Sequence, residues 1–196
     1  MRIWLFSFFI VLGFTAAAQK KSYADSIKAY QKNYVETHEV VKKPDWKFFK
    51  FYPVNTGYRV MASFEKIIDT SGFIMKTSGK LSKKYFRYGI LSFTIDNKPI
   101  HLTVYQSEQL MASEQYRNYL FVPFTDLTSG DKSYGGGRYM DFMLDDIKDN
   151  KLLVDFNKAY NPYCAYTSGY NCPIPPREND IAVAIRAGEM DFGKKH

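Results

Sequence analysis

The amino-acid sequence predicts a mainly β fold, either an antiparallel sandwich or a partly closed barrel, with one amphipathic helix near the N-terminus. Short runs of aromatic and β-branched residues, separated by Gly, Asn, Asp and Pro, make up most of the chain. A clear helical period occurs only before Pro44. The connections between the runs are too short for the crossover helices that parallel strands need, so we expect antiparallel pairing.

An apolar run opens the chain. It extends from Ile3 to Ala18, follows the single basic residue Arg2 and ends in three alanines. This pattern is typical of a secretory signal peptide, residues 1–18. The run is shorter than the roughly 20 residues of a membrane-spanning helix, so a retained anchor is the alternative interpretation. We therefore expect the mature chain to be exported, periplasmic or secreted, with no stable membrane insertion after cleavage.

A helix is expected between Ser22 and Val41. Its stripe of apolar and aromatic side chains repeats at helical spacing, with Lys and Gln between the members. Ser22 and Asp25 have the spacing of a capping box. The helix belongs to a segment, residues 19–45, that we expect to pack on a single β-rich domain, residues 46–196. The members of the stripe are Tyr23, Ile27, Tyr30, Tyr34 and Val41.

The expected strands are short runs rich in aromatic and β-branched residues. The clearest pair is a hairpin in which Asp96, Asn97 and Lys98 separate two alternating runs. A stretch that is rich in Pro and Tyr, Ala159 to Glu178, is expected to be an ordered loop. The expected strands are Trp46–Tyr52, Tyr58–Ile67, Phe73–Thr77, Tyr85–Ile95, Ile100–Gln106, Tyr119–Phe124, Leu152–Phe156 and Ile181–Ile185.

The composition excludes several classes of protein. Of the 196 residues, 45% are hydrophobic and 17% aromatic, which excludes a collagen, a coiled coil and a disordered chain. The formal net charge is +7. A basic chain could bind nucleic acid, but an exported protein rarely meets it, so we expect no nucleic-acid partner.

The last third of the sequence resembles a known family. Five stretches carry the resemblance to the uncharacterised prokaryotic family called domain of unknown function 1684. The resemblance continues more loosely back to Trp46. The resemblance implies neither an activity nor a cofactor. This chain has Met140 where the family pattern has Leu, and Ala182 where it has Pro. The five stretches are Val122–Gly130, Tyr134–Asp141, Leu153–Tyr166, Cys172–Asn179 and Ile185–Glu189.

Carboxylates near the expected strands are the candidates for catalysis. Asp141 and Glu189 could act as a general acid and base if their surroundings separate their pKa values. Arg138, three residues before Asp141, could orient it. A rim of amides, phenols and charges could instead bind a ligand, or could tie down the loop backbone. The candidate ligand-binding residues are Asp126, Tyr134, Arg138, Asp155, Asn157, Asn161, Tyr166 and Asn179.

Cysteines and histidines give further expectations. Cys164 and Cys172 lie eight positions apart and could form a disulfide in an exported protein. The histidines lack the spacing of a metal site, so we expect neither a metal nor a cofactor. The glycines between Tyr134 and Arg138 lack the Lys and Ser or Thr of a phosphate-binding loop, which favours a glycine-dependent turn.

Three functions remain open from the sequence. The first is a non-catalytic module that binds a small polar or carbohydrate ligand. The second is a hydrolase with paired carboxylates. The third is a structural protein of the cell envelope without a small ligand. The oligomeric state is left open.

Overall fold

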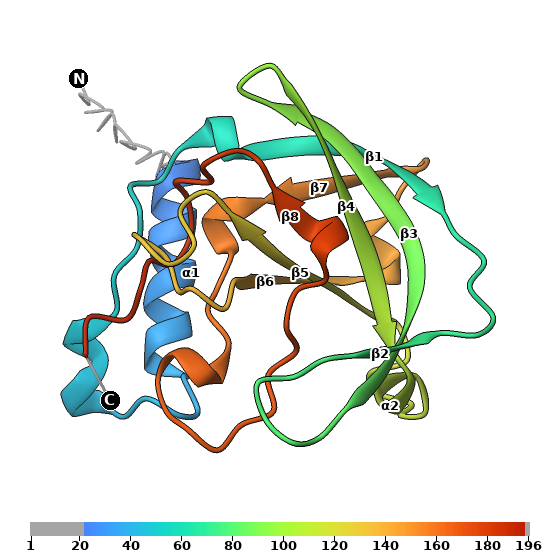
Figure 1. Ribbon diagram of the computed structural model, residues 1–196. Coiled ribbons are helices and arrows are strands. Elements are labelled where there is room, and N and C mark those ends of the chain that lie inside the picture. Colours follow the sequence, from blue (N-terminus) through green and yellow to red (C-terminus); the bar gives the residue numbers. More distant parts are fainter. Residues whose placement is uncertain (1–21, 195–196) are drawn as a thin grey trace, which may run out of the picture.

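A curled antiparallel sheet dominates the computed structural model, which describes residues 22–194. The sheet has the strand order β6-β5-β4-β3-β1-β7 and bends into a half-barrel (Figure 1). The short strand β2 pairs with β3, and β8 pairs with β5 in the one parallel pairing among the described strands. The strands are β1 (Arg59–Lys66), β2 (Phe73–Met75), β3 (Lys83–Ile95), β4 (Lys98–Ser107), β5 (Tyr119–Asp126), β6 (Arg138–Met143), β7 (Lys151–Asp155) and β8 (Asp180–Ile181).

Helices precede the first strand and occur in several of the connections. The longest is α1 (Tyr23–Glu36), which lies along one side of the half-barrel, and a single turn, α2 (Glu108–Met111), follows β4 (Figure 1). None of the described helices is long and apolar enough to cross a membrane. The others are 3-10 helices: Lys43–Phe48, Thr56–Tyr58, Leu144–Asp146, Phe156–Lys158, Tyr163–Ala165 and Arg177–Asn179.

The expected hairpin is the longest strand pair of the sheet. Strands β3 and β4 are joined by Asp96 and Asn97, whose φ values of 51° and 59° match the mirror-image turn that suits twisted strands. A bulge after Arg87 bends β3. At the bend, the ring of Phe64 occupies the space beside Gly89 where a Cβ would lie, so only glycine fits.

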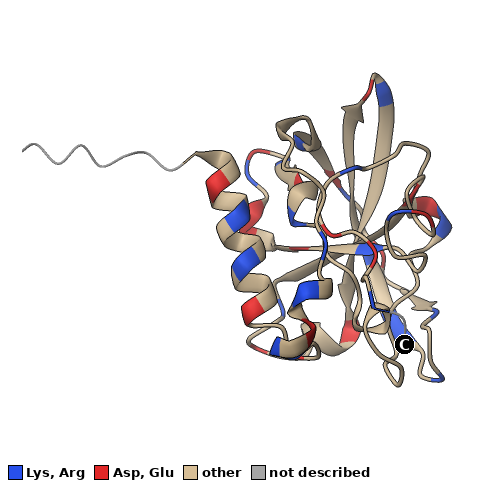
Figure 2. Cartoon of the chain, turned by 90° about the vertical axis from the view of Figure 1, so that its left-hand side faces the viewer, with Lys and Arg blue, Asp and Glu red and all other residues tan. Residues whose placement is uncertain are grey.

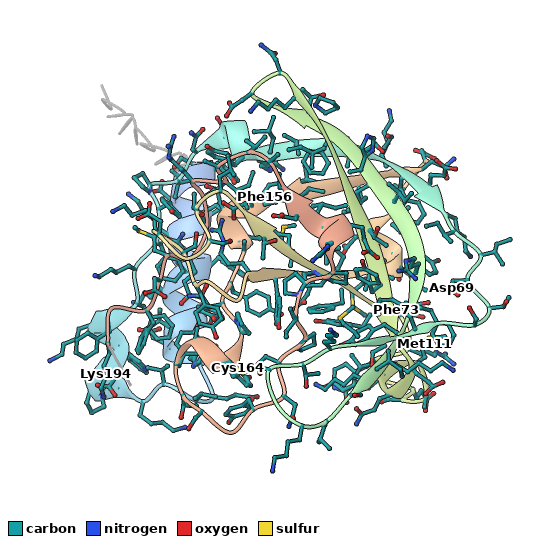
Figure 3. All side chains as sticks on the ribbon, in the orientation of Figure 1. Asp69, Phe73, Met111, Phe156, Cys164 and Lys194 are labelled. Atoms are coloured by element: carbon teal, nitrogen blue, oxygen red, sulfur yellow. A yellow bond between two sulfur atoms is a disulfide. The ribbon has the colours of Figure 1, made fainter. Side chains whose placement is uncertain are left out.

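An apolar core fills the interior of the curled sheet. Side chains from strands β1 and β3 to β8 and from the C-terminal segment meet there, and Phe156 lies among them (Figure 3). Burying each large aliphatic or aromatic side chain contributes roughly 1.5–3 kcal/mol to folding. Fully buried members include Ala62, Leu91, Leu102, Leu120, Val122, Phe124, Val154, Phe156 and Ile185.

The predicted N-terminal helix is present as α1, and it is shorter than predicted at its C-terminal end. Ser22 caps α1 through its hydroxyl, which accepts from the Asp25 N–H at 3.1 Å. The helix ends at Glu36, before the predicted end at Val41. There the Val41 N–H donates to the His38 ring at 2.9 Å, which forms a turn instead of continuing the helix. The expected signal peptide lies outside the described residues.

Two predicted strands differ from the structure, and one observed strand was not predicted. The segment predicted as strand Trp46–Tyr52 begins inside a 3-10 helix, which has Pro44 in its first turn and lacks the extended backbone of a strand. The expected strand Ile181–Ile185 forms a ladder only at Asp180–Ile181. Strand β6 was not predicted, because its Arg138 and Asp141 interrupt the apolar pattern that marks the other strands.

Candidate functional site

A buried ion pair joins β6 to the end of β5. Arg138 and Asp126 are both inaccessible to solvent at their side chains, with their nitrogen and oxygen 2.7 Å apart. The guanidinium also donates to the carbonyls of Ile185, Ala187 and Glu189. The Asp126 carboxylate accepts from the Thr128 hydroxyl and the Ile185 N–H. This pair therefore organises the chain around it and presents no charge to solvent.

Buried amides connect distant segments in the same way. The Asn179 side chain bonds both backbone groups of Thr103 and the Pro123 carbonyl, all within 2.9 Å. The Asn157 amide bonds both backbone groups of Asn55, each at 2.9 Å. Loop backbone that has no strand partner must be satisfied by side chains of this kind. These two asparagines, Asn157 and Asn179, are buried, with 1% and 0% of their surface exposed.

Glu189 is fully buried beneath α1. Its carboxylate accepts from the Tyr166 hydroxyl at 2.8 Å, the Asn161 N–H at 2.9 Å and the Tyr34 hydroxyl at 3.3 Å. Loss of solvation raises its pKa to about 7, although these donors and Arg138 act in the opposite direction. The carboxyl therefore titrates near neutrality without reaching solvent. It connects α1, through Tyr34, to the loop that follows β7.

Asp141 has a different environment. Its residue on β6 is exposed, while the Tyr119 and Tyr160 hydroxyls donate to its two carboxylate oxygens, the second at 2.6 Å. Protein surrounds the carboxylate on its other sides and displaces water, which raises its pKa despite the hydrogen bonds that lower it. The two phenols therefore hold the carboxylate in place while the residue keeps one side open to solvent.

Two cavities meet at Asp141, and we call them together the Asp141 site. The first, the Asp155 cavity, encloses about 450 Å³ between α1 and strands β1, β6 and β7. Its floor includes Asp155, which accepts from the Tyr23 hydroxyl at 2.8 Å. Charges of both signs line it. The lining residues are Tyr23, Ser26, Ile27, Tyr30, Arg59, Asp141, Phe142, Asp146, Leu153, Asp155 and Lys158.

The second, the Tyr163 cavity, adjoins the first along α1. It encloses about 310 Å³ and shares Tyr30 and Asp141 with the Asp155 cavity. Aromatic rings and two carboxylates form its walls. The lining residues are Tyr30, Tyr34, Thr37, His38, Glu39, Asp141, Tyr160 and Tyr163. Both volumes fall within or close to the range that holds small ligands in proteins.

The structure separates the predicted site residues into two groups. Asp141 and Asp155 line the same cavity. The others lie in the buried network or in the packing beneath α1 and line neither cavity of the site. Tyr134 packs at the edge of a small aromatic cluster, and its carbonyl accepts from the Gly137 N–H at 3.1 Å. The residues of this second group are Asp126, Tyr134, Arg138, Asn157, Asn161, Tyr166, Asn179 and Glu189.

Several residues of the site were not singled out from the sequence as ligand-binding. Three tyrosines of α1 line it, and the signal for them was the stripe at helical spacing, which was interpreted as packing surface only. No sequence pattern distinguished Arg59, Lys158 or Tyr119. The folding of the chain brings Arg59 and Lys158 into the cavity that Asp141 lines, and strand pairing brings Tyr119 to Asp141. The three helix tyrosines are Tyr23, Tyr30 and Tyr34.

The loop that carries Tyr160 and Tyr163 is held by covalent and backbone links. Cys164 and Cys172 form a disulfide, with Cα atoms 6.3 Å apart. Figure 3 labels Cys164 in this loop, near the end of α1. The Tyr160 and Tyr139 backbones pair with each other, which connects the loop to β6. Within residues 22–194, no three His, Cys, Asp or Glu side chains gather as metal ligands would.

Comparisons with known proteins identify relatives of uncharacterised function. The family model described as "Protein of unknown function (DUF1684)" matches residues 45–190. Among solved structures, the solution NMR structure of an uncharacterized protein from Haloarcula marismortui is 30% identical to this chain, with a TM-score of 0.64. The match covers 84% of this chain and 92% of that one. No protein of curated function matches the chain.

Proposed function

The chain belongs to the DUF1684 family of proteins of unknown function, as its sequence resemblance predicted, and we propose that it is a non-catalytic module that binds a small polar or carbohydrate ligand at the Asp141 site. The proposal rests on geometry, because the family is described as of unknown function and the similar solved structure is that of an uncharacterized protein. The proposal includes the amphipathic character expected of α1, because the tyrosine stripe of the helix would form one wall of the site.

One observation carries the proposal: Asp141 is an exposed carboxylate with a raised pKa that is fixed by two phenol hydroxyls in a wall shared by two cavities. A carboxyl group whose pKa is shifted by its surroundings in a cavity is a candidate for a functional residue. The rings of Tyr23 and Tyr30 offer faces on which a sugar could stack, and the polar groups around them could bond its hydroxyls.

A ligand screen on one matched pair of variants tests this proposal. We expect neutral sugars and polyols to raise the unfolding temperature of the wild type, and Asp141→Asn to lose that effect. Asn keeps one acceptor oxygen, and it replaces a carboxyl whose pKa is raised by burial. The variant should therefore unfold within a few degrees of the wild type. Asp145→Asn, which is exposed and lines no cavity of the site, is the control. Ligands that stabilise wild type and Asp141→Asn equally would contradict the proposal.

We propose further that the protein is exported and acts in the periplasm or outside the cell. The apolar run of residues 3–18 supports this, and a disulfide such as Cys164–Cys172 is typical of oxidising compartments. Mass spectrometry of the protein from fractionated cells tests it. We expect a mature N-terminus at Gln19 and an oxidised cysteine pair in the exported fraction. An intact N-terminus in the cytoplasmic fraction would contradict export.

A hydrolase is the second candidate, and a different observation favours it. The Asp155 cavity brings Asp141, Asp146 and Asp155 to one space. A carboxyl with a raised pKa is suited to act as general acid, and a second carboxylate in the same cavity could act as base or nucleophile. Product formation from a sugar that binds, abolished in both Asp141→Asn and Asp155→Asn, would select this candidate over the binding module.

A further inference from the structure

The two cavities of the Asp141 site differ in charge. The Asp155 cavity has Arg59 and Lys158 among its lining residues, which offset its carboxylates. The Tyr163 cavity has Glu39 and Asp141 but neither Lys nor Arg. Among residues 22–194, neither Glu39 nor Asp141 forms a salt bridge within 4.0 Å. The Tyr163 cavity is therefore a concave surface whose two carboxylates form no ion pair with the described residues, and the nearby Lys42 ammonium bonds the backbone carbonyl of Glu39 instead, at 2.6 Å.

Tyrosine hydroxyls hold both carboxylates toward the rings. Tyr163 donates to Glu39 at 2.7 Å, and Tyr160 donates to Asp141 at 2.6 Å. These bonds fix the positions of the two carboxylates and supply no positive charge. His38 does not neutralise them either, because burial lowers its pKa to about 4 and leaves the ring uncharged at neutral pH.

Aromatic rings line much of the cavity and pack against one another. The Tyr34 ring centroid lies 5.3 Å from that of His38 and 6.1 Å from that of Tyr160. His38 and Tyr163 follow at 5.7 Å, with ring planes 72° apart. Aromatic walls attract cations through their ring quadrupoles, and several rings around one space are the usual means of binding quaternary ammonium groups. A neighbouring Lys158 ammonium already lies 5.5 Å from the Tyr30 centroid, on the residue that the two cavities share.

We propose that the Tyr163 cavity binds an organic ammonium group, so that the ligand of the Asp141 site is a small polar molecule that carries a positive charge. This inference rests on the proposed function and specifies its ligand class. The aromatic rings would contact the methyl or methylene groups around the nitrogen, and Glu39 and Asp141 would supply the opposite charge. The polar remainder of the ligand would extend past Asp141 into the Asp155 cavity.

A pair of probes of equal shape tests the inference. Choline carries a trimethylammonium group, and 3,3-dimethylbutan-1-ol has a neutral tert-butyl group in its place. We expect choline to bind the wild type at least about tenfold more tightly in titration calorimetry, because the neutral compound lacks the electrostatic attraction. Glu39→Gln should weaken choline binding several-fold and leave the neutral compound unaffected. Glu36→Gln, an exposed position of α1 that lines neither cavity, should change neither affinity.

A second variant separates the rings from the charge. Tyr163→Leu should weaken choline binding, since it removes an aromatic wall and the hydroxyl that holds Glu39. Circular dichroism would verify that the variant remains folded. Equal affinity for the two probes, or no effect of Glu39→Gln, would overturn the inference. Neutral sugars that bind with dependence on Asp141 would then leave the proposed function standing, whereas absence of binding by every probe would overturn both.

Discussion

Arg138 connects β6 to the end of β5 and to the C-terminal segment. Its two terminal nitrogens bond three carbonyls of the C-terminal segment and the Asp126 carboxylate, and the side chain has no exposed surface. A guanidinium can make such a set of bonds because its donors form a rigid planar fork. The same residue carries no ligand-binding surface, since all four bonds are internal.

We expect Arg138→Met to destabilise the fold by about 3–5 kcal/mol, because it leaves Asp126 as an unpaired buried charge. Urea unfolding measures the loss. The control is Arg186→Met at an exposed position of the same region, which should change the free energy of unfolding by about 0.5 kcal/mol or less. If both variants lost less than about 1 kcal/mol, the Arg138 network would not be the anchor that its contacts indicate.

Glu189 makes stability depend on pH. Burial raises its pKa from 4.5 to about 7, so between these values the folded protein holds a proton that the unfolded chain has released. Its stabilising contribution is therefore fully present below about pH 4.5 and is lost as the pH rises through 7. His38 has the opposite effect, since its lowered pKa favours the folded state as the pH rises above 4.

Comparison with Glu189→Gln isolates the effect of Glu189, because His38 is common to both proteins. Between pH 5 and pH 8 the wild type should lose roughly 1–3 kcal/mol of stability relative to the variant. Chemical unfolding at a series of pH values measures the difference. A difference that stays constant over this range would mean that Glu189 does not titrate within it.

Strand β6 positions the site. It places Arg138 in the interior and Asp141 in the wall of the two cavities, three residues apart on one strand. The glycine-dependent turn expected before it is present at Gly137, whose φ is +86°. A Cβ there would lie 2.6 Å from the Phe124 carbonyl and 2.7 Å from the Pro175 ring. The turn therefore sets the start of β6 against both β5 and the proline-rich loop.

Gly137→Ala should destabilise the protein by about 2 kcal/mol or more, because it combines backbone strain with a clash. Gly169→Ala is the matched control: its φ is +93°, and no atom lies within 4 Å of an added Cβ. The control should lose only the roughly 1 kcal/mol that the backbone conformation costs. Thermal unfolding of the two variants tests the difference, and equal losses would show that the close approach at Gly137 has no energetic consequence.

Elements with simple local patterns could be predicted from the sequence. The helix period of Tyr23, Ile27 and Tyr30 and the hairpin turn at Asp96 and Asn97 depend on neighbours in the chain, and both are present. Strand β6 could not be recognised, because its Arg138 is acceptable in the interior only when Asp126 and distant carbonyls satisfy it.

At the scale of the whole molecule, the sheet curls into a half-barrel, which corresponds to the partly closed barrel of the two predicted alternatives. The path of the strands creates the Asp141 site. Figure 2 shows charges of both signs along α1, so the outer surface of the helix has no single charge that would mark a partner. The surface proposed to bind a ligand is instead on the side where α1 meets β6 and β7. Asp141 could be singled out from the sequence, but its neighbours Arg59, Tyr119 and Lys158 could not, because contacts between residues far apart in the chain bring them there.

Chemical-shift mapping by NMR tests the central claim most directly. The ¹⁵N-labelled protein would be titrated with the sugar, polyol or choline that raises its unfolding temperature most. The account predicts shifts concentrated at α1, β6 and residues 158–163, and their disappearance in Asp141→Asn. Saturable shifts confined to another face, such as the cavity between Lys98 and Val183, would contradict it, and so would the same shifts in Asp141→Asn.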